Sequence, residues 1–187
     1  MDMWQPYKDI AETYFKNATI VIDKYHFIQH VIWAFERVRK SEQKKFAAVR
    51  RKYFKRSRFL LLKRMRNLNE EEIQAVEVML KTSSKLQDAY MLKEKFYDFI
   101  DSPDLESAKQ NLKAWYLFVS TCNVPEFDTC VKTINNWEKY ILNSFTCNYT
   151  NGYTEGINNK IKVLKRNAYG VRNFKRFRNR ILHMMSC

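Results

Sequence analysis

The residues best suited to chemistry lie near the end of the chain, where one carboxylate precedes a basic segment. After Asn151-Gly152, a dipeptide typical of tight turns, an apolar stripe recurs at helical spacing. A polar row recurs at the same spacing, offset by two positions, which on a helix is a rotation of roughly 200°. The polar row therefore faces away from the core. The stripe is Ile157, Ile161, Leu164 and Ala168, and the row is Glu155, Asn159, Lys162 and Arg166.

Two interpretations of Glu155 are open. A surface acid in the first turn of a helix is stabilised by the helix dipole, by some tenths of a kcal/mol. Alternatively, the basic side chains hold a polyanion and Glu155 takes part in chemistry on it, because an ordinary solvated face usually mixes charges of both signs. Spacing alone favours the first interpretation.

A second candidate group, Asp23 and His26, follows the apolar, β-branched run Ala18–Ile22. This run predicts a strand buried on both faces, and open α/β sheets place functional groups where a strand gives way to a helix. The alternative is that Asp23 caps the following helix and His26 is a partly buried ring, and without further context it is favoured. A buried strand needs neighbours, and no other segment predicts one.

The composition indicates a nucleic-acid partner for a mostly helical protein. Among 187 residues there are only 3 Gly and 3 Pro, fewer than strand-and-turn architectures need. Residues 34–66 hold 14 basic residues against two acids, residues 160–180 hold nine and no acid, and the net charge is +14. No apolar run is long enough to cross a bilayer and no signal peptide is evident. We expect a cytoplasmic, soluble protein with reduced cysteines.

Helices must position both candidate groups. Residues 40–66 keep a helical pattern, so their cations either form a solvated face or follow a phosphate backbone, and the charge density slightly favours the second. The acidic middle of the chain predicts a helical bundle in which Asn69 caps one helix and Asp101–Asp104 separates two others. No nucleotide-binding glycine loop and no Ser-His-Asp arrangement is present.

The C-terminal segment predicts two consecutive helices that share one basic surface. Tyr169-Gly170 ends the first, and Asn173 caps a second in which Phe174, Phe177 and Ile181 pack inward. Long cationic side chains on the outer faces suit the phosphates of DNA. The candidate DNA-binding residues are Asn159, Lys162, Lys165, Arg166, Arg172, Lys175, Arg176, Arg178 and Arg180.

Several motifs together resemble the bacterial insertion-sequence DDE transposases of the ISL-three type. They run in that family's order and cover essentially the whole chain, and they are specific only in combination. The motifs are Asp2-Met3-Trp4-x-x-Tyr7, Ile22-Asp23-Lys24-Tyr25-His26-Phe27, Asn151-Gly152-x-x-Glu155-Gly156-x-Asn158, Ile161-Lys162-x-Leu164-Lys165-Arg166 and Tyr169-Gly170-x-Arg172-Asn173-Phe174.

The resemblance implies a ribonuclease H-like fold whose three carboxylates hold divalent metal, normally Mg²⁺. It implies that Asp2 is the second catalytic acid and metal ligand, that Glu155 is the third, and that Asp23 and His26 form an accessory Asp-x-x-His motif. Paired metal ions in such a site activate water or a 3′-hydroxyl and stabilise the leaving oxygen of a phosphodiester. Spacing alone favours Glu155 as a surface acid, whereas the resemblance favours it as a catalytic acid.

The resemblance also sets the expected organisation. We expect a mostly α chain with a partial ribonuclease H-like α/β core in residues 1–40 that keeps one clear strand, a large helical insertion in residues 41–148, and C-terminal core helices with the third acid in residues 149–187. The family's first acid lies on a strand well before Asp2. We therefore expect a C-terminal part of a transposase that binds DNA but does not complete the metal site alone.

The alternative is a non-catalytic module that binds nucleic acid or a transposase. DNA is the expected partner in both cases, with a full-length transposase or a second copy of the chain as the candidate protein partners. We expect no membrane partner and no small-molecule substrate.

Overall fold

The computed structural model describes residues 1–56, 58–147 and 152–186. It divides into two compact units, Met1–Asn148 and Tyr149–Cys187, and each is described by itself. Both units consist of helices and connecting segments, and the described residues contain no strand. The prediction of a mostly α chain is confirmed.

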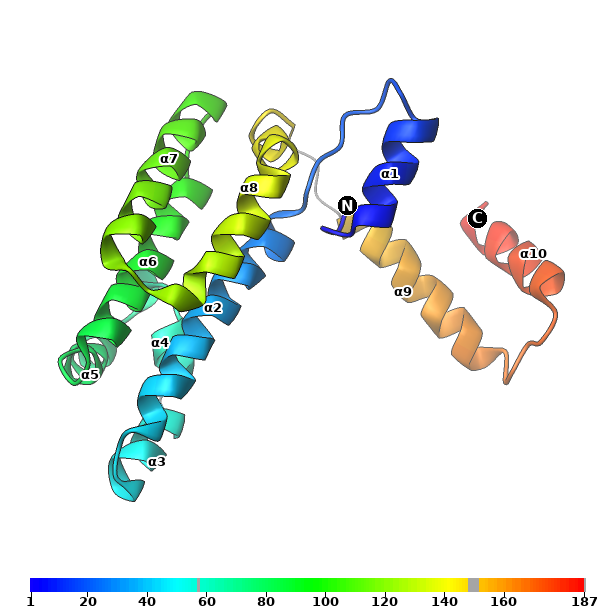
Figure 1. Ribbon diagram of the computed structural model, residues 1–187. Helices are drawn as coiled ribbons and strands as arrows, with labels where there is room; N and C mark the ends of the chain where they lie inside the picture. The colour runs from blue at the N-terminus through cyan, green and yellow to red at the C-terminus, as the bar shows by residue number, and fades with distance from the viewer. Residues whose placement is uncertain (57, 148–151, 187) are drawn as a thin grey trace. The chain divides into compact units, whose positions relative to one another are not determined.

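The first unit is a helical bundle (Figure 1). Its α-helices are α1 (Gln5–Tyr14), α2 (Lys24–Lys44), α3 (Ala48–Arg56), α4 (Arg58–Leu62), α5 (Glu70–Leu80), α6 (Ser84–Ile100), α7 (Leu105–Cys122) and α8 (Asp128–Leu142). Short 3₁₀ turns connect some of them, namely η1 (Met65–Asn67), η2 (Pro125–Phe127) and η3 (Asn143–Phe145).

The core of this unit lies where α2, α6, α7 and α8 pack together. Aromatic rings form its centre: the ring centroids of Phe96 and Trp115 are 4.8 Å apart, and Phe27 of α2 lies 6.3 Å from Phe96. The buried Trp115 indole N–H donates a 2.9 Å hydrogen bond to the carbonyl of Leu92, so the ring contributes burial without an unpaired donor. α2 is therefore held in place along much of its length.

Polar residues at the helix ends define where these helices begin. Asn69 and Glu72 form a reciprocal capping box at the start of α5, which confirms the predicted cap. Ser83 caps α6 and Asp104 caps α7, each by accepting the backbone N–H of the third residue of its helix. α6 ends at Ile100 and α7 begins at Leu105, so residues 101–104 separate two helices as the sequence predicted.

The predicted strand at Ala18–Ile22 is wrong, because this segment is irregular rather than paired in a sheet. Its backbone groups find partners one at a time: the Asn143 amide donates to the Ile20 carbonyl at 2.7 Å, and the Ile22 N–H donates to the Tyr140 carbonyl at 3.2 Å. Ile20 and Ile22 are buried, while Thr19 is exposed. β-branched residues encode an extended backbone, but a strand also requires a neighbouring strand.

The second unit consists of α9 (Gly152–Asn167) and α10 (Phe174–Met185). The connection uses left-handed backbone at Tyr169 (φ 46°) and Gly170 (φ 91°), which ends α9 as predicted. Asn173 caps α10 by accepting the Arg176 N–H at 3.1 Å, also as predicted.

Two local predictions for this unit fare differently. Phe177 and Ile181 are partly buried as predicted, whereas Phe174 is 74% exposed, so the prediction that it packs inward is wrong. Of the predicted turn at Asn151-Gly152, Asn151 lies outside the described residues.

Other expectations about organisation remain predictions. α2 runs through Lys40 without interruption, so the proposed boundary between a partial core and an insertion falls inside one helix. Within the described residues, no helix is long and apolar enough to cross a membrane.

Candidate nucleic-acid and acid site

The N-terminal candidate group contains a direct contact between an acid and an imidazole. Asp2 Oδ1 lies 2.8 Å from His26 Nε2. A carboxylate only accepts hydrogen bonds, so the Nε2 of His26 carries the hydrogen and donates it. The Asp2 carboxylate is half exposed and His26 is more enclosed, so the pair is accessible to a ligand from the Asp2 side.

The irregular segment before α2 holds this pair in place. The Met1 ammonium donates to the Val21 carbonyl at 2.7 Å, and the Asp23 N–H donates to the Met1 carbonyl at 3.4 Å. These two bonds fix the chain on both sides of Met1, and therefore fix the start of the Asp2 side chain beside the first turn of α2. A contact between residues 24 positions apart in sequence is thus built by backbone hydrogen bonds.

Asp23 acts as the cap of α2. Its carboxylate accepts the Tyr25 N–H at 2.9 Å, which is the structural alternative that the sequence analysis left open. Capping does not exclude a further role, because a carboxylate has four lone-pair positions. Asp2, Asp23 and His26 therefore lie together at one end of α2.

His30, which the sequence analysis did not single out, lies one turn beyond His26 on α2. Its ring packs edge-on against Trp33, with the ring centroids 5.2 Å apart. Burial, then the positive charge of Arg37, then His26 lower the pKa of His30 below its ordinary value. The ring of His30 is therefore less readily protonated than an ordinary histidine. The signal in the sequence was the spacing of four between the two histidines.

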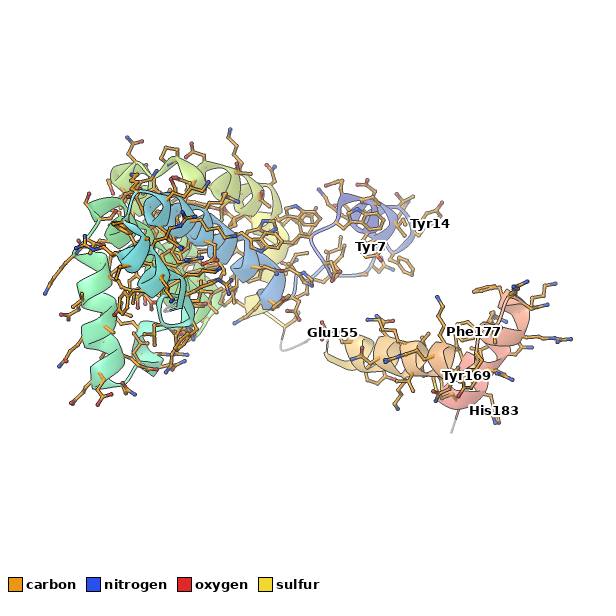
Figure 2. All side chains as sticks on the ribbon, turned by 90° about the horizontal axis from the view of Figure 1, so that it is seen from below. Tyr7, Tyr14, Glu155, Tyr169, Phe177 and His183 are labelled. Atoms are coloured by element: carbon orange, nitrogen blue, oxygen red, sulfur yellow. The ribbon has the colours of Figure 1, made fainter. Side chains whose placement is uncertain are left out.

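Glu155 belongs to the second unit and lies in the first turn of α9, where Figure 2 labels it. Its side chain is exposed, and no acid follows it in the sequence. The stripe of Ile157, Ile161 and Leu164 is partly buried, so the helix presents the predicted apolar face on one side. The predicted separation of a polar and an apolar face on α9 is confirmed.

The nine candidate DNA-binding residues are all exposed on α9, on α10 or in the connection between them. The two ranges 165–166 and 172–180 hold seven arginine and lysine residues. In the described part of this unit none of them has a carboxylate partner, because its one acid, Glu155, is at the start of α9. Lys162, Lys165, Arg166, Gly170 and Val171 line a shallow hollow of about 590 Å³. Cations arranged this way can contact several phosphates.

The candidate metal ligands do not make a complete site within the described residues. Carboxylate oxygens are the ligands that Mg²⁺ prefers, so Asp2 and Glu155 suit it chemically. However, no group of three or more His, Cys, Asp or Glu side chains that could hold a metal ion comes together in residues 1–56, 58–147 and 152–186. Asp2 and His26 form a pair, and Glu155 lies in the other unit.

Comparison with known proteins places these features in context. A family model described as Transposase, DDE_Tnp_ISL3, matches residues 1–181. The transposase for insertion sequence element IS1001 of Bordetella parapertussis is 26% identical over 180 residues, which are 95% of this chain and 44% of that protein. The transposase for insertion sequence element IS1557 of Mycobacterium tuberculosis strain H37Rv is 29% identical over 123 residues, which are 66% of this chain and 28% of that protein.

A further relative has a different name. A protein of Lactococcus lactis subsp. lactis named ATP-dependent protease is 35% identical over 121 residues, which are 64% of this chain and 36% of that protein. The chain thus spans less than half the length of each of these relatives. No solved structure matches it.

Proposed function

Because this chain belongs to the ISL-three family of DDE transposases, we propose that it carries the DNA-holding helices and two of the three acids of a transposase, Asp2 and Glu155. The observation that carries the proposal is the placement of Glu155 at the head of an otherwise acid-free, basic pair of helices. A carboxylate in that position meets a phosphodiester that the neighbouring cations hold.

The proposed division of labour follows from the exposure of each group. Asn159, Lys162, Lys165 and Arg166 on α9, with the cations of α10 and the connection, bind the DNA backbone through its phosphates. Asp2 is oriented by His26, which donates to one of its oxygens and leaves the other for a ligand. Asp23 stabilises the start of α2 and so keeps His26 in place. DNA transposition itself is proposed for the complete protein.

We further propose that residues 1–187 alone do not cut DNA, because the family resemblance assigns them two of the three acids, Asp2 and Glu155. Divalent metal, when held by a full set of carboxylates, supplies the activation of the attacking oxygen. In this chain Asp2 and Glu155 are the residues that would contribute oxygen ligands. The cytoplasm, where chromosomal DNA is accessible in bacteria, is the proposed site of action.

The test is a strand-cleavage assay with labelled duplex that carries the ends of the insertion sequence, in the presence of Mg²⁺ or Mn²⁺. We expect binding without cleavage by the 187-residue chain. Substitution of Lys162, Lys165 and Arg166 by glutamine weakens binding, and Glu155→Gln leaves binding intact. Efficient cutting by the chain alone contradicts the proposed incompleteness, and unchanged binding by the triple variant contradicts the proposed DNA surface.

Exposed apolar side chains on α1 favour a second candidate function, association with a full-length transposase. Trp4, Tyr7, Ile10, Tyr14 and Phe15 are all exposed, and Figure 2 labels Tyr7 and Tyr14 on this helix. Trp4 and Phe15 flank the helix. Exposed apolar side chains concentrated in one segment are typical of interaction sites. This role predicts that the chain co-purifies with the intact transposase and that Tyr7→Ser with Tyr14→Ser abolishes the co-purification. Separate elution of the two wild-type proteins would contradict it.

A further inference from the structure

A concave basic surface lies in the first unit, between the C-terminal part of α2 and α3. This groove has a volume of about 690 Å³. Six of the nine residues that line it are arginine or lysine, and none is acidic. The lining residues are Arg39, Lys40, Gln43, Lys44, Phe46, Ala48, Arg51, Lys52 and Lys55.

Buried contacts between the two helices set the shape of the groove. The Gln43 amide of α2 donates to the Arg51 carbonyl of α3 at 3.2 Å. The rings of Phe46 and Phe54 pack against each other with centroids 4.7 Å apart, and the Arg50 guanidinium lies over Phe46 at 5.9 Å. Because Phe54 is fully buried, α3 cannot turn its basic face away without exposing that ring.

The acids nearest to the groove in sequence are already engaged. Glu36 accepts hydrogen bonds from Arg39 and Arg58, and Glu42 accepts from Lys45 and Ser83. The charge of Arg39 is therefore balanced. The other cations of the groove have no carboxylate partner within the described residues, and they are Lys40, Lys44, Arg51, Lys52 and Lys55.

We infer that this groove binds the sugar-phosphate backbone of double-stranded DNA. Five uncompensated cations on two adjoining helices repel one another, and a phosphate backbone removes that repulsion while releasing its own counterions. Lysine and arginine side chains on a concave surface reach phosphates without reading bases, so the contact positions DNA and carries no sequence preference.

The aromatic residues of the groove favour a duplex over a single strand. Proteins that hold single strands present aromatic faces on which bases stack. Here Phe46 and Phe54 are committed to each other, and Tyr53 packs edge-on against Phe54 with centroids 6.3 Å apart. Phe46, the aromatic residue among those that line the groove, is therefore packed against Phe54 and Arg50 rather than presented to a base. It lies wholly in the first unit, so the inference does not depend on the role proposed for Glu155 or for the helices α9 and α10.

The test compares three variants of the whole chain by fluorescence anisotropy on a duplex of about 20 base pairs, which is roughly two helical turns. The groove variant carries Lys44→Gln, Lys52→Gln and Lys55→Gln. The control carries Lys16→Gln, Lys113→Gln and Lys132→Gln, which are exposed and remove the same charge elsewhere. A third variant carries Lys162→Gln, Lys165→Gln and Arg166→Gln. Circular dichroism checks that all three keep their helices.

We expect the groove variant to bind roughly 10-fold to 100-fold more weakly at about 0.1 M salt, and its plot of log affinity against log salt to lose a slope of about 2 to 3, since each phosphate contact contributes about 0.9. Binding by the groove variant that equals the control overturns the inference, even if the third variant shows that α9 binds DNA. The inference is also overturned if the groove variant loses affinity only for single-stranded DNA, or only for anionic vesicles, and binds the duplex as the control does. If the groove variant loses affinity and the third variant does not, the groove inference is supported and the DNA surface proposed on α9 is contradicted.

Discussion

Replacing Glu36 by glutamine removes one buried charge and leaves the shape of the side chain unchanged. Glu36 is 6% exposed and Arg39 is 3% exposed. Arg39 Nε donates to Glu36 Oε1 at 2.6 Å and Arg39 Nη2 donates to Oε2 at 3.2 Å, so the pair is bidentate. Arg58 donates to the same Oε2 at 2.7 Å, but its side chain is half exposed. The three residues join α2 to α4 beside the basic groove.

The two arginines contribute differently to the expected effect. Removing one partner of a buried pair leaves an uncompensated buried charge and costs about 3 to 5 kcal/mol. The bond to the half-exposed Arg58 contributes about 0 to 1 kcal/mol because water screens it. A glutamine carbonyl still accepts one hydrogen bond from Arg39, which places the expected loss of unfolding free energy near the lower limit, at about 3 kcal/mol.

Urea unfolding of the whole chain, followed by circular dichroism and by tryptophan fluorescence, measures this loss. We expect Glu36→Gln to lower the unfolding free energy by about 3 kcal/mol at pH 7, and Glu36→Gln with Arg39→Met to recover much of it, since the stranded charge is then gone. Arg58→Gln is the matched control and costs less than about 1 kcal/mol. Equal effects of Glu36→Gln and Arg58→Gln would refute the assignment of the energy to burial of Arg39.

The same pair predicts an acid-sensitive stability. Burial alone would raise the pKa of Glu36, but the hydrogen bonds from Arg39 and Arg58 outweigh it and lower the pKa below the ordinary 4.5. A lowered folded-state pKa means that the stabilisation is fully present above pH 4.5 and is lost as the pH falls through the folded-state value. The difference in stability between the wild type and Glu36→Gln should therefore shrink below that pH. A constant difference would contradict the linkage.

Two further changes give measurable outcomes. Lys93→Met should lower the unfolding free energy by about 2 to 4 kcal/mol, because the fully buried ammonium donates to the carbonyls of Leu61 and Lys63 at 2.9 Å each and both would lose their donor; an unchanged urea midpoint would contradict this. Gly170→Ala should speed amide hydrogen exchange in α9 and α10, because alanine at φ 91° is strained by about 1 kcal/mol. Gly156→Ala should slow this exchange, because Gly156 lies inside α9 with open space at its Cβ and alanine favours the helix. Exchange rates that change in the same direction in the two variants would contradict this account of Gly170.

The helical part of the fold was predictable because its signals are local. The caps at Asn69 and Asn173 use side chains that bond to the backbone three residues away, so the sequence alone contains both partners. The left-handed end of α9 at Tyr169-Gly170 is equally local. By contrast, the contact of Asp2 with His26 joins distant residues through backbone bonds around Met1, and only the family resemblance brought these two residues into one group.

The basic groove shows a different limit of the sequence. Counting charges in residues 34–66 detects an excess of cations but does not separate those that are balanced from those that are free to bind a ligand. The structure makes that separation, since Arg39, Lys45 and Arg58 neutralise Glu36 and Glu42. What remains on the surface is a smaller set of cations on two neighbouring helices. Pairing over long sequence distances, such as that of Arg58 with Glu36, decides which charges a ligand can meet.

The incorrectly predicted strand follows from the same difference between local and distant partners. Around Ile22, the Met1 ammonium donates to Val21 and the Asp23 N–H donates to Met1, which is the pattern by which one residue of a parallel strand pairs with its neighbour. Ile20 and Ile22 are buried on one side, as in a strand. The partner contributes a single residue, however, so no ladder forms. The β-branched run thus encodes an extended backbone that accepts a parallel neighbour, and whether it becomes a strand depends on how much neighbouring chain lies alongside it.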